Sequence, residues 1–503
     1  MRTGGERVRV RWRRCCSPLH RLSRRPLALG LLTSAAVQAL GALTGVLTAR
    51  ALGPHDRGLL AAALLWPQLL ILLGGLGIAE AVTVHLARAP WPDRDGQPGD
   101  GWAAVLGAAL AITAAQAGAL LALGLALVPL VGGRLLPDAA TLTVPALALI
   151  PVYLVTLALM AALAGLRRFA VFHALRLLIG GGYALALVAL ALCGGLTPLT
   201  AMLAYIGAHL LAGLVAACTV RPGFPAPGWR GVARPLLSYG LRSHVGTLGA
   251  AVCERADQVA VAALLPPARL GAYLAAVSLS APVGLVGAAV AVTALPVVAG
   301  AQHGETQAAT IRRYVYRSAV SALLLALPLA IGAPWLVEWW FGPAFREAAA
   351  PARILAFAAG VWGVGRVLGA VLRAVGAPGA AARCDLLAAM GVVGGLPVLV
   401  PHLGISGAAA AVALGALVGA VAAVRSVVRV LGLAPWGSQG PLAEPALTPG
   451  PSPARGGGVA DPGPPVPRPP GKAARHSTGS GPRYAGGWAG RGEGFTRAGG
   501  DDR

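Results

Sequence analysis

The chain has 503 residues, of which 56% are hydrophobic and only 12% are charged, and its mean hydropathy is +0.70. This composition excludes an ordinary soluble globule and predicts an all-α polytopic membrane protein. The net charge is +23. Because the arginines lie between apolar segments and in both tails rather than on one face, no nucleic-acid partner is expected. The six cysteines show no CxxC spacing, so the sequence predicts no disulfide framework, metal site or cofactor.

The first part of the chain contains six predicted membrane spans. An arginine-rich tail over residues 1–26 precedes Leu27–Ala49, which has no charge and is long enough to cross about 30 Å of hydrocarbon. An uncleaved helix explains this segment better than a secretory signal, whose apolar core would be shorter. The following spans are predicted at Leu59–Ala79, Gly101–Gly133, Ala139–Leu166 and two within Leu177–Val220, which the sequence CGGLTP divides at residues 193–198. These six spans would form a first lobe over residues 27–220.

The second part repeats this rhythm after a polar linker at residues 221–234. Six further spans are predicted over residues 235–431, at Pro235–Val261, Leu270–Gly300, Ser318–Val337, Ile354–Leu372, Leu386–Val400 and Ile405–Val424. The segment ALLPPARLG at 263–271 echoes ALGPHDRG at 51–58, about 212 residues earlier. An even number of spans in each copy predicts two six-helix lobes that enter the membrane from the same side and are related by an axis along its normal.

The distribution of arginine predicts the orientation. Of the arginines assigned to loops and to the N-terminal tail, 24 lie on the side of that tail and 6 on the opposite side. Positive loops face the cytoplasm, so the twelve-span prediction places both termini inside the cell. Residues 432–503 are rich in Pro, Gly and Arg without apolar periodicity, which predicts a disordered cytoplasmic tail.

Four motifs resemble a known family. They are LTARALGPHDRG at 47–58, ERADQ at 254–258 with LGAYLAA at 270–276, FGPAF at 341–345, and LGISGAA at 403–409. In this order and within a double repeat, they resemble the polysaccharide biosynthesis flippases of the multidrug/oligosaccharidyl-lipid/polysaccharide (MOP) exporter superfamily, over about residues 27–431. The resemblance implies MATE-like lobes around a central cavity in the bacterial cytoplasmic membrane. It also implies that a polyprenyl-diphosphate-linked glycan moves between leaflets by alternating access.

Charged residues inside the predicted spans are candidates for substrate contact. A charge at bilayer depth costs roughly 2.5–3.5 kcal/mol on insertion scales, so it usually faces a cavity or a partner. Arg242 and Arg366 lie deepest in apolar segments, and with His244 they are the predicted substrate-binding residues. A guanidinium group matches phosphate oxygens well. The alternative is that both arginines extend to the membrane surface.

Four more ionisable residues are candidates for gating or ion coupling. Glu80 ends the second predicted span, and Glu254, Arg255 and Asp257 lie towards the outer end of the seventh. They could bind a coupling ion, either a proton or sodium. The alternative is an interfacial ion pair that fixes helix packing, with Asp257 bound to a neighbouring arginine.

Other functions remain open at this stage. A multidrug or lipid II exporter of the same superfamily would share these features. A membrane-embedded glycosyltransferase or polymerase would need a catalytic acid or base on a sizeable outer loop. The largest predicted outer loop, Glu338–Arg353, carries only Glu338 and Glu347 as acids. No catalytic residue is therefore predicted, and the chain is not expected to be an enzyme. A purely structural scaffold would have no cavity.

Overall fold

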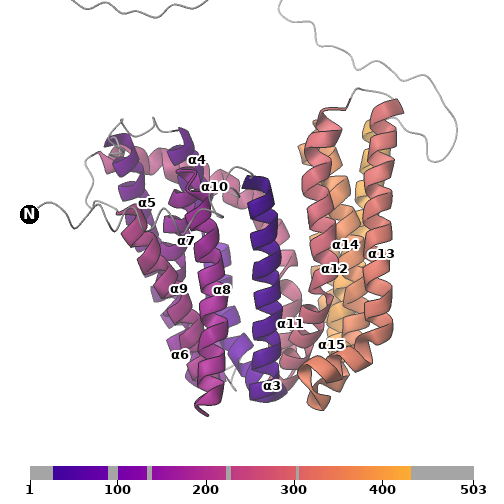
Figure 1. Ribbon diagram of the computed structural model, residues 1–503, viewed down its shortest axis with the longest axis horizontal. Helices are drawn as coiled ribbons and strands as arrows, with labels where there is room; N and C mark the ends of the chain where they lie inside the picture. Colours follow the sequence, from indigo (N-terminus) through magenta and orange to yellow (C-terminus); the bar gives the residue numbers. More distant parts are fainter. Residues whose placement is uncertain (1–25, 89–99, 133–138, 222–227, 302–304, 432–503) are drawn as a thin grey trace, which may run out of the picture. The chain divides into compact units, whose positions relative to one another are not determined.

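A computed structural model describes residues 26–88, 100–132, 139–221, 228–301 and 305–431. The predicted disordered tail, almost all of the predicted basic tail, and residues 222–227 of the linker between the predicted lobes lie outside these ranges. Every regular element in the described ranges is a helix, which confirms the predicted all-α class (Figure 1).

The described residues of the first half of the chain form helices, most of them long. They are α3 (Pro26–Gly74), α4 (Ile78–Arg88), α5 (Asp100–Leu130), α6 (Ala140–Ala146), α7 (Leu149–Gly165), α8 (Phe169–Leu192) and α9 (Pro198–Val220). The predicted break between α8 and α9 is present. Gly194 has φ +66° there, and Thr197 and Thr200 form a reciprocal capping box that satisfies the first amides of α9.

The second half continues the pattern. Its helices are α10 (Trp229–Cys253), α11 (Ala256–Leu264), α12 (Pro267–Ala299), α13 (Glu305–Phe341), the short 3₁₀ helix η3 (Pro343–Ala348), α14 (Ala349–Ala374) and α15 (Pro378–Leu431). Helix α14 packs against α12, α13 and α15, so these elements form the centre of the second repeat.

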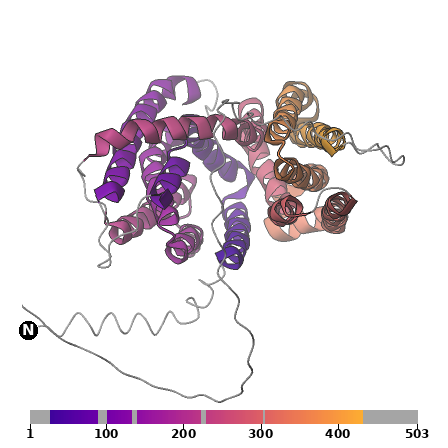
Figure 2. The ribbon, with the colours of Figure 1, turned by 90° about the horizontal axis from the view of Figure 1, so that it is seen from above.

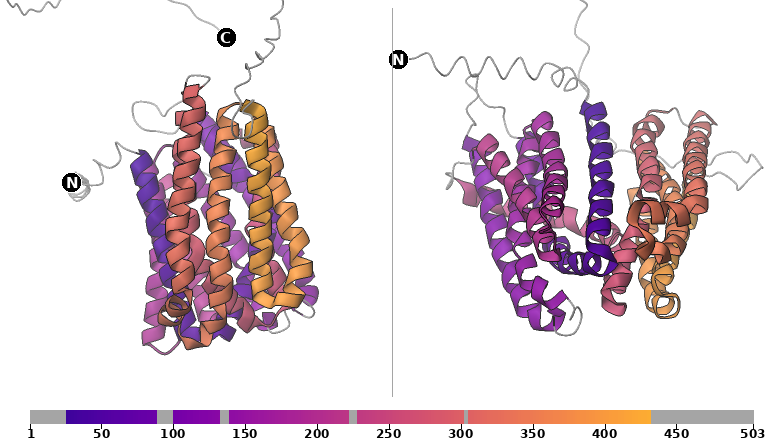
Figure 3. Two further views of the ribbon diagram at one scale, coloured as in Figure 1. Left: turned by 90° about the vertical axis from the view of Figure 1, so that its right-hand side faces the viewer. Right: turned by 60° about the horizontal axis from the view of Figure 1, so that its bottom comes forward.

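Among the described residues, nine helical segments are long and apolar enough to cross a membrane. Two of them, over 43 and 54 residues, are each long enough for two crossings. Each of these two contains a glycine with non-helical backbone, Gly53 in α3 and Gly404 in α15. Figure 3 shows the bend in α3. Helix α10 is not among the nine. The chain is thus a multi-pass membrane protein, whereas the count of twelve spans and the direction of the termini stay predictions.

The two repeats meet at equivalent positions. A methyl group added at Gly58 would lie 1.8 Å from the carbonyl oxygen of Pro267, and one added at Gly271 would lie 2.0 Å from that of Pro54. These four residues are the matching positions of the two echoed motifs. Only glycine allows such close backbone approach, which explains why both motifs contain it in the same place. The reciprocal contact supports the internal repeat inferred from the sequence.

This contact encloses Arg57, the arginine of the first echoed motif. Arg57 is only 5% exposed, and its guanidinium group donates to Gly271 O (3.4 Å) and to Ser278 Oγ (3.5 Å). Its Cζ lies 5.4 Å from the ring centroid of Phe341 and 5.7 Å from that of Phe345. Arg57 is buried because the glycine contact packs its motif against the second repeat.

Helix α10 does not pack with the second repeat alone. It contacts α4 and α5 of the first half as well as α15 of the second, and Figure 2 shows its length. By contrast, α11 packs mainly against α15 and also contacts α12. The predicted seventh span therefore consists of two helices with different neighbours. The boundaries of the two lobes stay predictions.

Candidate functional site

The predicted seventh span is broken at its charged residues. Helix α10 ends at Cys253 and α11 begins at Ala256, so Glu254 and Arg255 form the turn between them. All of α11, 9 residues and about 14 Å long, lies between this turn and Leu265. Irregular backbone at membrane depth is tolerated where it is buried in protein or lines a water-filled cavity.

Arg366 reaches this break from α14. Its Nη2 donates to Glu254 Oε1 at 3.3 Å, and the two side chains are 44% and 63% exposed. Arg366 lies roughly two turns before the end of α14 at Ala374. The structure thus brings together one predicted substrate-binding residue and one predicted coupling residue. A carboxylate partner for Arg366 was not among the sequence predictions.

The other two charged residues of the motif have different partners. Arg255 Nη1 donates to Gln258 Oε1 at 3.1 Å. Asp257 is buried, and its carboxylate accepts hydrogen bonds from the Tyr273 hydroxyl (2.6 Å) and from the backbone amide of Gln258 (2.8 Å). In the described ranges Asp257 forms no ion pair with an arginine, so the proposed interfacial pair is replaced by a hydrogen bond that joins α11 to α12.

The two remaining candidates for substrate contact both lie on α10. His244 Nε2 is 3.2 Å from the carbonyl oxygen of Leu73, at the end of α3. This contact gives His244 a structural role beside the predicted one, because carbonyls at a helix end lack intrahelical partners. Arg242 lies exposed on the same helix.

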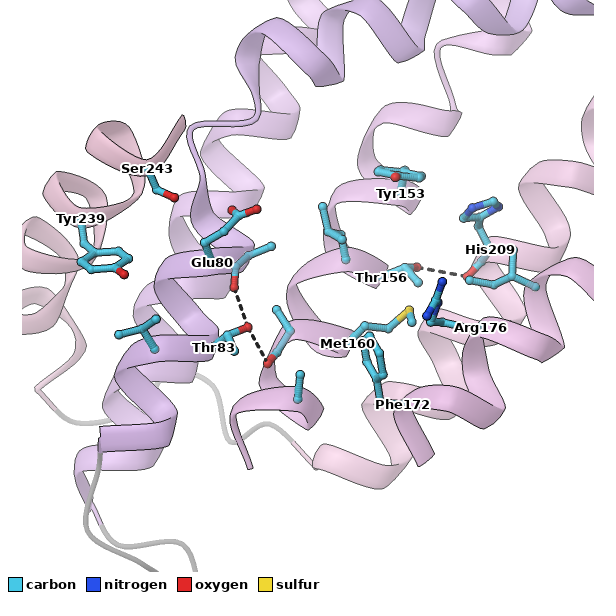
Figure 4. Close-up of a pocket in the computed structure, with 16 residues that line it drawn as sticks. Glu80, Thr83, Tyr153, Thr156, Met160, Phe172, Arg176, His209, Tyr239 and Ser243 are labelled. Atoms are coloured by element: carbon cyan, nitrogen blue, oxygen red, sulfur yellow. Dashed lines mark hydrogen bonds between the residues drawn. The ribbon is translucent and has the colours of Figure 1, made fainter. Parts of the chain in front are cut away.

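Glu80 lines a cavity of about 590 Å³, within the size range of small-molecule sites. Its walls come from α4, α7, α8, α9 and α10 (Figure 4). Most of the lining is apolar or aromatic, and the polar and aromatic side chains are Glu80, Thr83, Tyr153, Thr156, Phe172, Arg176, His209, Tyr239 and Ser243. Figure 4 shows Glu80 and Arg176 on different walls. Sequence reasoning missed Arg176 and Tyr239, since both lie near span ends where charged and aromatic residues are common.

Hydrogen bonds hold the helices around this cavity together. Thr83 Oγ1 donates to Ala161 O at 3.2 Å, which joins α4 to α7. Thr156 Oγ1 donates to His209 O at 3.1 Å, which joins α7 to α9. The ring of His209 lies 4.5 Å from that of Tyr205. The helices that line the cavity are therefore joined by side-chain hydrogen bonds. In the described part of the chain, no cluster of His, Cys, Asp or Glu could hold a metal ion.

A family model described as "Polysaccharide biosynthesis protein" matches residues 28–302, more than half of the chain. The chain belongs to this polysaccharide biosynthesis family. The family assignment predicted from the four motifs is thereby confirmed. No curated protein matches the sequence of this family member.

Solved structures with the same fold belong to the MOP superfamily. The structure of "Lipid II flippase MurJ, inward closed conformation" aligns at a TM-score of 0.67 with 11% identity, over 80% of this chain and 89% of that one. A MATE family multidrug transporter in an inward-facing conformation aligns at 0.61 with 14% identity, over 79% and 95%. An outward-facing MATE structure aligns at 0.54 with 15% identity, over 82% and 96%. The predicted MATE-like architecture is confirmed, and at these identities the likeness shows the fold alone.

Proposed function

We propose that this member of the polysaccharide biosynthesis family is a flippase that moves a polyprenyl-diphosphate-linked oligosaccharide across the cytoplasmic membrane of a bacterium. The observation that carries the proposal is the break in the seventh span, where Glu254 pairs with Arg366. Discontinuous helices of this kind form the substrate sites of many transporters. The family and the fold also support a flippase function.

The chemistry of such a substrate fits these residues. A diphosphate cannot enter hydrocarbon without cationic partners, whereas the polyprenyl chain can remain in the lipid. Arg366 would bind the phosphates from α14, and the exposed Arg242 would contribute from α10. Because α10 contacts helices of both halves of the chain, the head group would be held where the halves meet.

A coupling ion is part of the proposal. Glu80 offers a carboxylate to the cavity of the first half, and a proton or sodium ion that neutralised it would change the charge of that cavity. Collapse of the proton or sodium gradient in proteoliposomes should then slow export. The alternative driving forces are the membrane potential and the substrate gradient.

A second candidate function is export of amphiphilic organic cations. The observation that favours it is this same cavity, whose lining is mostly apolar with several aromatic rings and a single carboxylate, from Glu80. Aromatic faces and a carboxylate attract cations. Arg176 in the same lining opposes such a ligand, so the glycan proposal is preferred. Lipid II remains a candidate within the same substrate class, as another lipid-linked saccharide.

The proposal is tested by replacing Arg242 and Arg366 with Ala. Loss of a hydrogen bond to a charged group costs about 1.5–3 kcal/mol, so each variant should export lipid-linked glycan at least about tenfold more slowly. The measurement is glycan export by whole cells, normalised to the protein level in the membrane. Arg269→Ala is the control, since Arg269 forms an exposed ion pair with Glu347 near the start of α12. Full export in both test variants would contradict the proposal.

A further inference from the structure

The ion pair between Glu254 and Arg366 has a longer contact distance than two other ion pairs in the described ranges. Arg269 and Glu347 approach to 2.6 Å, and Arg346 and Glu338 to 2.8 Å, in the range of charge-assisted hydrogen bonds. The Glu254–Arg366 distance is longer, at 3.3 Å. It is a single contact through Nη2, although a guanidinium group has five N–H donors.

The position of Glu254 allows this contact to be released. Glu254 lies in the turn between α10 and α11, so its backbone can change conformation without breaking a helical hydrogen-bond ladder. The neighbouring residues are held in place, because Asp257 is bound to Tyr273 and Arg255 to Gln258. Glu254 itself is 63% exposed. The carboxylate is thus tethered beside Arg366 but weakly held there.

We propose that Glu254 is a tethered counter-ion that competes with the phosphates of the substrate for Arg366. The inference rests on the proposed function and deepens it. In the empty carrier, Glu254 is hydrogen-bonded to Arg366 and offsets its positive charge, which is costly in a helix apolar enough to cross a membrane. A diphosphate offers several oxygens and can bind the guanidinium group in a bidentate manner, so it displaces the single carboxylate contact. When Glu254 returns, it helps to release the head group.

If Glu254 competes with the substrate, substitutions of Glu254 and of Arg366 should have opposite effects on the affinity for a lipid diphosphate. Exposed pairs contribute about 0.2–1 kcal/mol, so Glu254→Gln should bind a lipid diphosphate roughly 1.4- to fivefold more tightly. Arg366→Gln should bind it at least about tenfold more weakly. The double variant should match Arg366→Gln, since removal of the competitor has no effect once its target is gone. Glu254→Gln should also export glycan more slowly despite tighter binding.

The experiment measures binding of radiolabelled polyprenyl diphosphate to the full-length chain in phosphatidylcholine nanodiscs. Glu347→Gln is the matched control, because it neutralises the carboxylate of another exposed pair and should leave the affinity unchanged. Thermal unfolding of each variant checks that it is folded.

Each outcome is decisive. If both single variants bind more weakly, the pair is a fixed structural contact and the inference is overturned. If Arg366→Gln weakens binding and Glu254→Gln leaves it unchanged, the inference fails while the proposed function stands. If the two single variants and the double variant show the predicted affinities but the chain exports no lipid-linked glycan, the counter-ion role stands and the proposed function fails.

Discussion

In two of the predicted spans the helix is interrupted, and the side chains around the two breaks differ. The second span is interrupted between Gly74 and Ile78, and the seventh between Cys253 and Ala256. At the first break, Gln116 Nε2 donates to Gly74 O at 2.6 Å, and His244 lies against Leu73 O. At the second break, the turn carries charged and exposed side chains.

The comparison indicates different roles for the two helix breaks. Free carbonyls at the first break are satisfied by side chains of neighbouring helices, so this break serves to shape the fold. The second break presents ionisable groups, including Glu254 paired with Arg366, so we propose that it contacts the substrate. We therefore expect substitutions of Gly77 and Gln116 at the first break to change stability, and substitutions of Glu254 and Arg366 at the second to change transport.

The largest effect is expected from Gly77→Ala at the first break. Gly77 has φ +62°, and an added methyl group would lie 2.2 Å from the carbonyl oxygen of Gly240 on α10. Backbone strain and overpacking together predict a loss of about 2–5 kcal/mol in the free energy of unfolding. Thermal unfolding in detergent measures it. The control is Gly41→Ala, because Gly41 has open space around it. Equal stability of the two variants would contradict a close-packed break.

An intermediate effect is expected from Gln116→Ala. Gln116 is buried, and its loss would remove the hydrogen bond to the carbonyl oxygen of Gly74. An unsatisfied buried group costs about 1–3 kcal/mol, so the unfolding temperature should fall. Export per folded molecule should stay near the wild-type level. A normal unfolding temperature with lost export would instead place Gln116 in the transport path.

The smallest change in stability is expected from Glu254→Gln at the second break. Its ion pair is exposed, so the free energy of unfolding should change by less than about 1 kcal/mol. Transport and substrate binding should nevertheless change, as the counter-ion role requires. Thermal unfolding of the variant beside the wild type measures the difference. A strongly destabilised variant would mean that the two breaks serve the same structural purpose.

Most of the fold could be predicted from the sequence, because hydrocarbon imposes a simple rule on length and polarity. Uncharged segments of about 20 residues predict helices, and glycine or proline motifs predict where they end. Gly53 and Gly404 lie in two of the motifs that indicated the family, and both mark bends in long helices. The echoed turns also indicated the repeat, whose glycines meet in the structure.

The site could be predicted only in part. The sequence indicated Glu254 and Arg366 separately, because charges in apolar segments are costly and therefore conspicuous. It did not indicate that they pair, since residues so far apart in the chain meet only through helix packing. The sequence did not indicate Arg176 and Tyr239, because both lie near span ends. Only the cavity that they share with Glu80 marks them as candidates.

By itself, the sequence determined that this chain is an all-helical membrane protein with an internal repeat and a family-specific set of motifs. The tertiary structure decided where the charges lie: Arg57 is buried between the repeats, Asp257 is bound to Tyr273, and Glu254 faces Arg366. The physical reason is that span formation depends on local hydropathy, whereas the partner of a buried charge depends on which helices pack together.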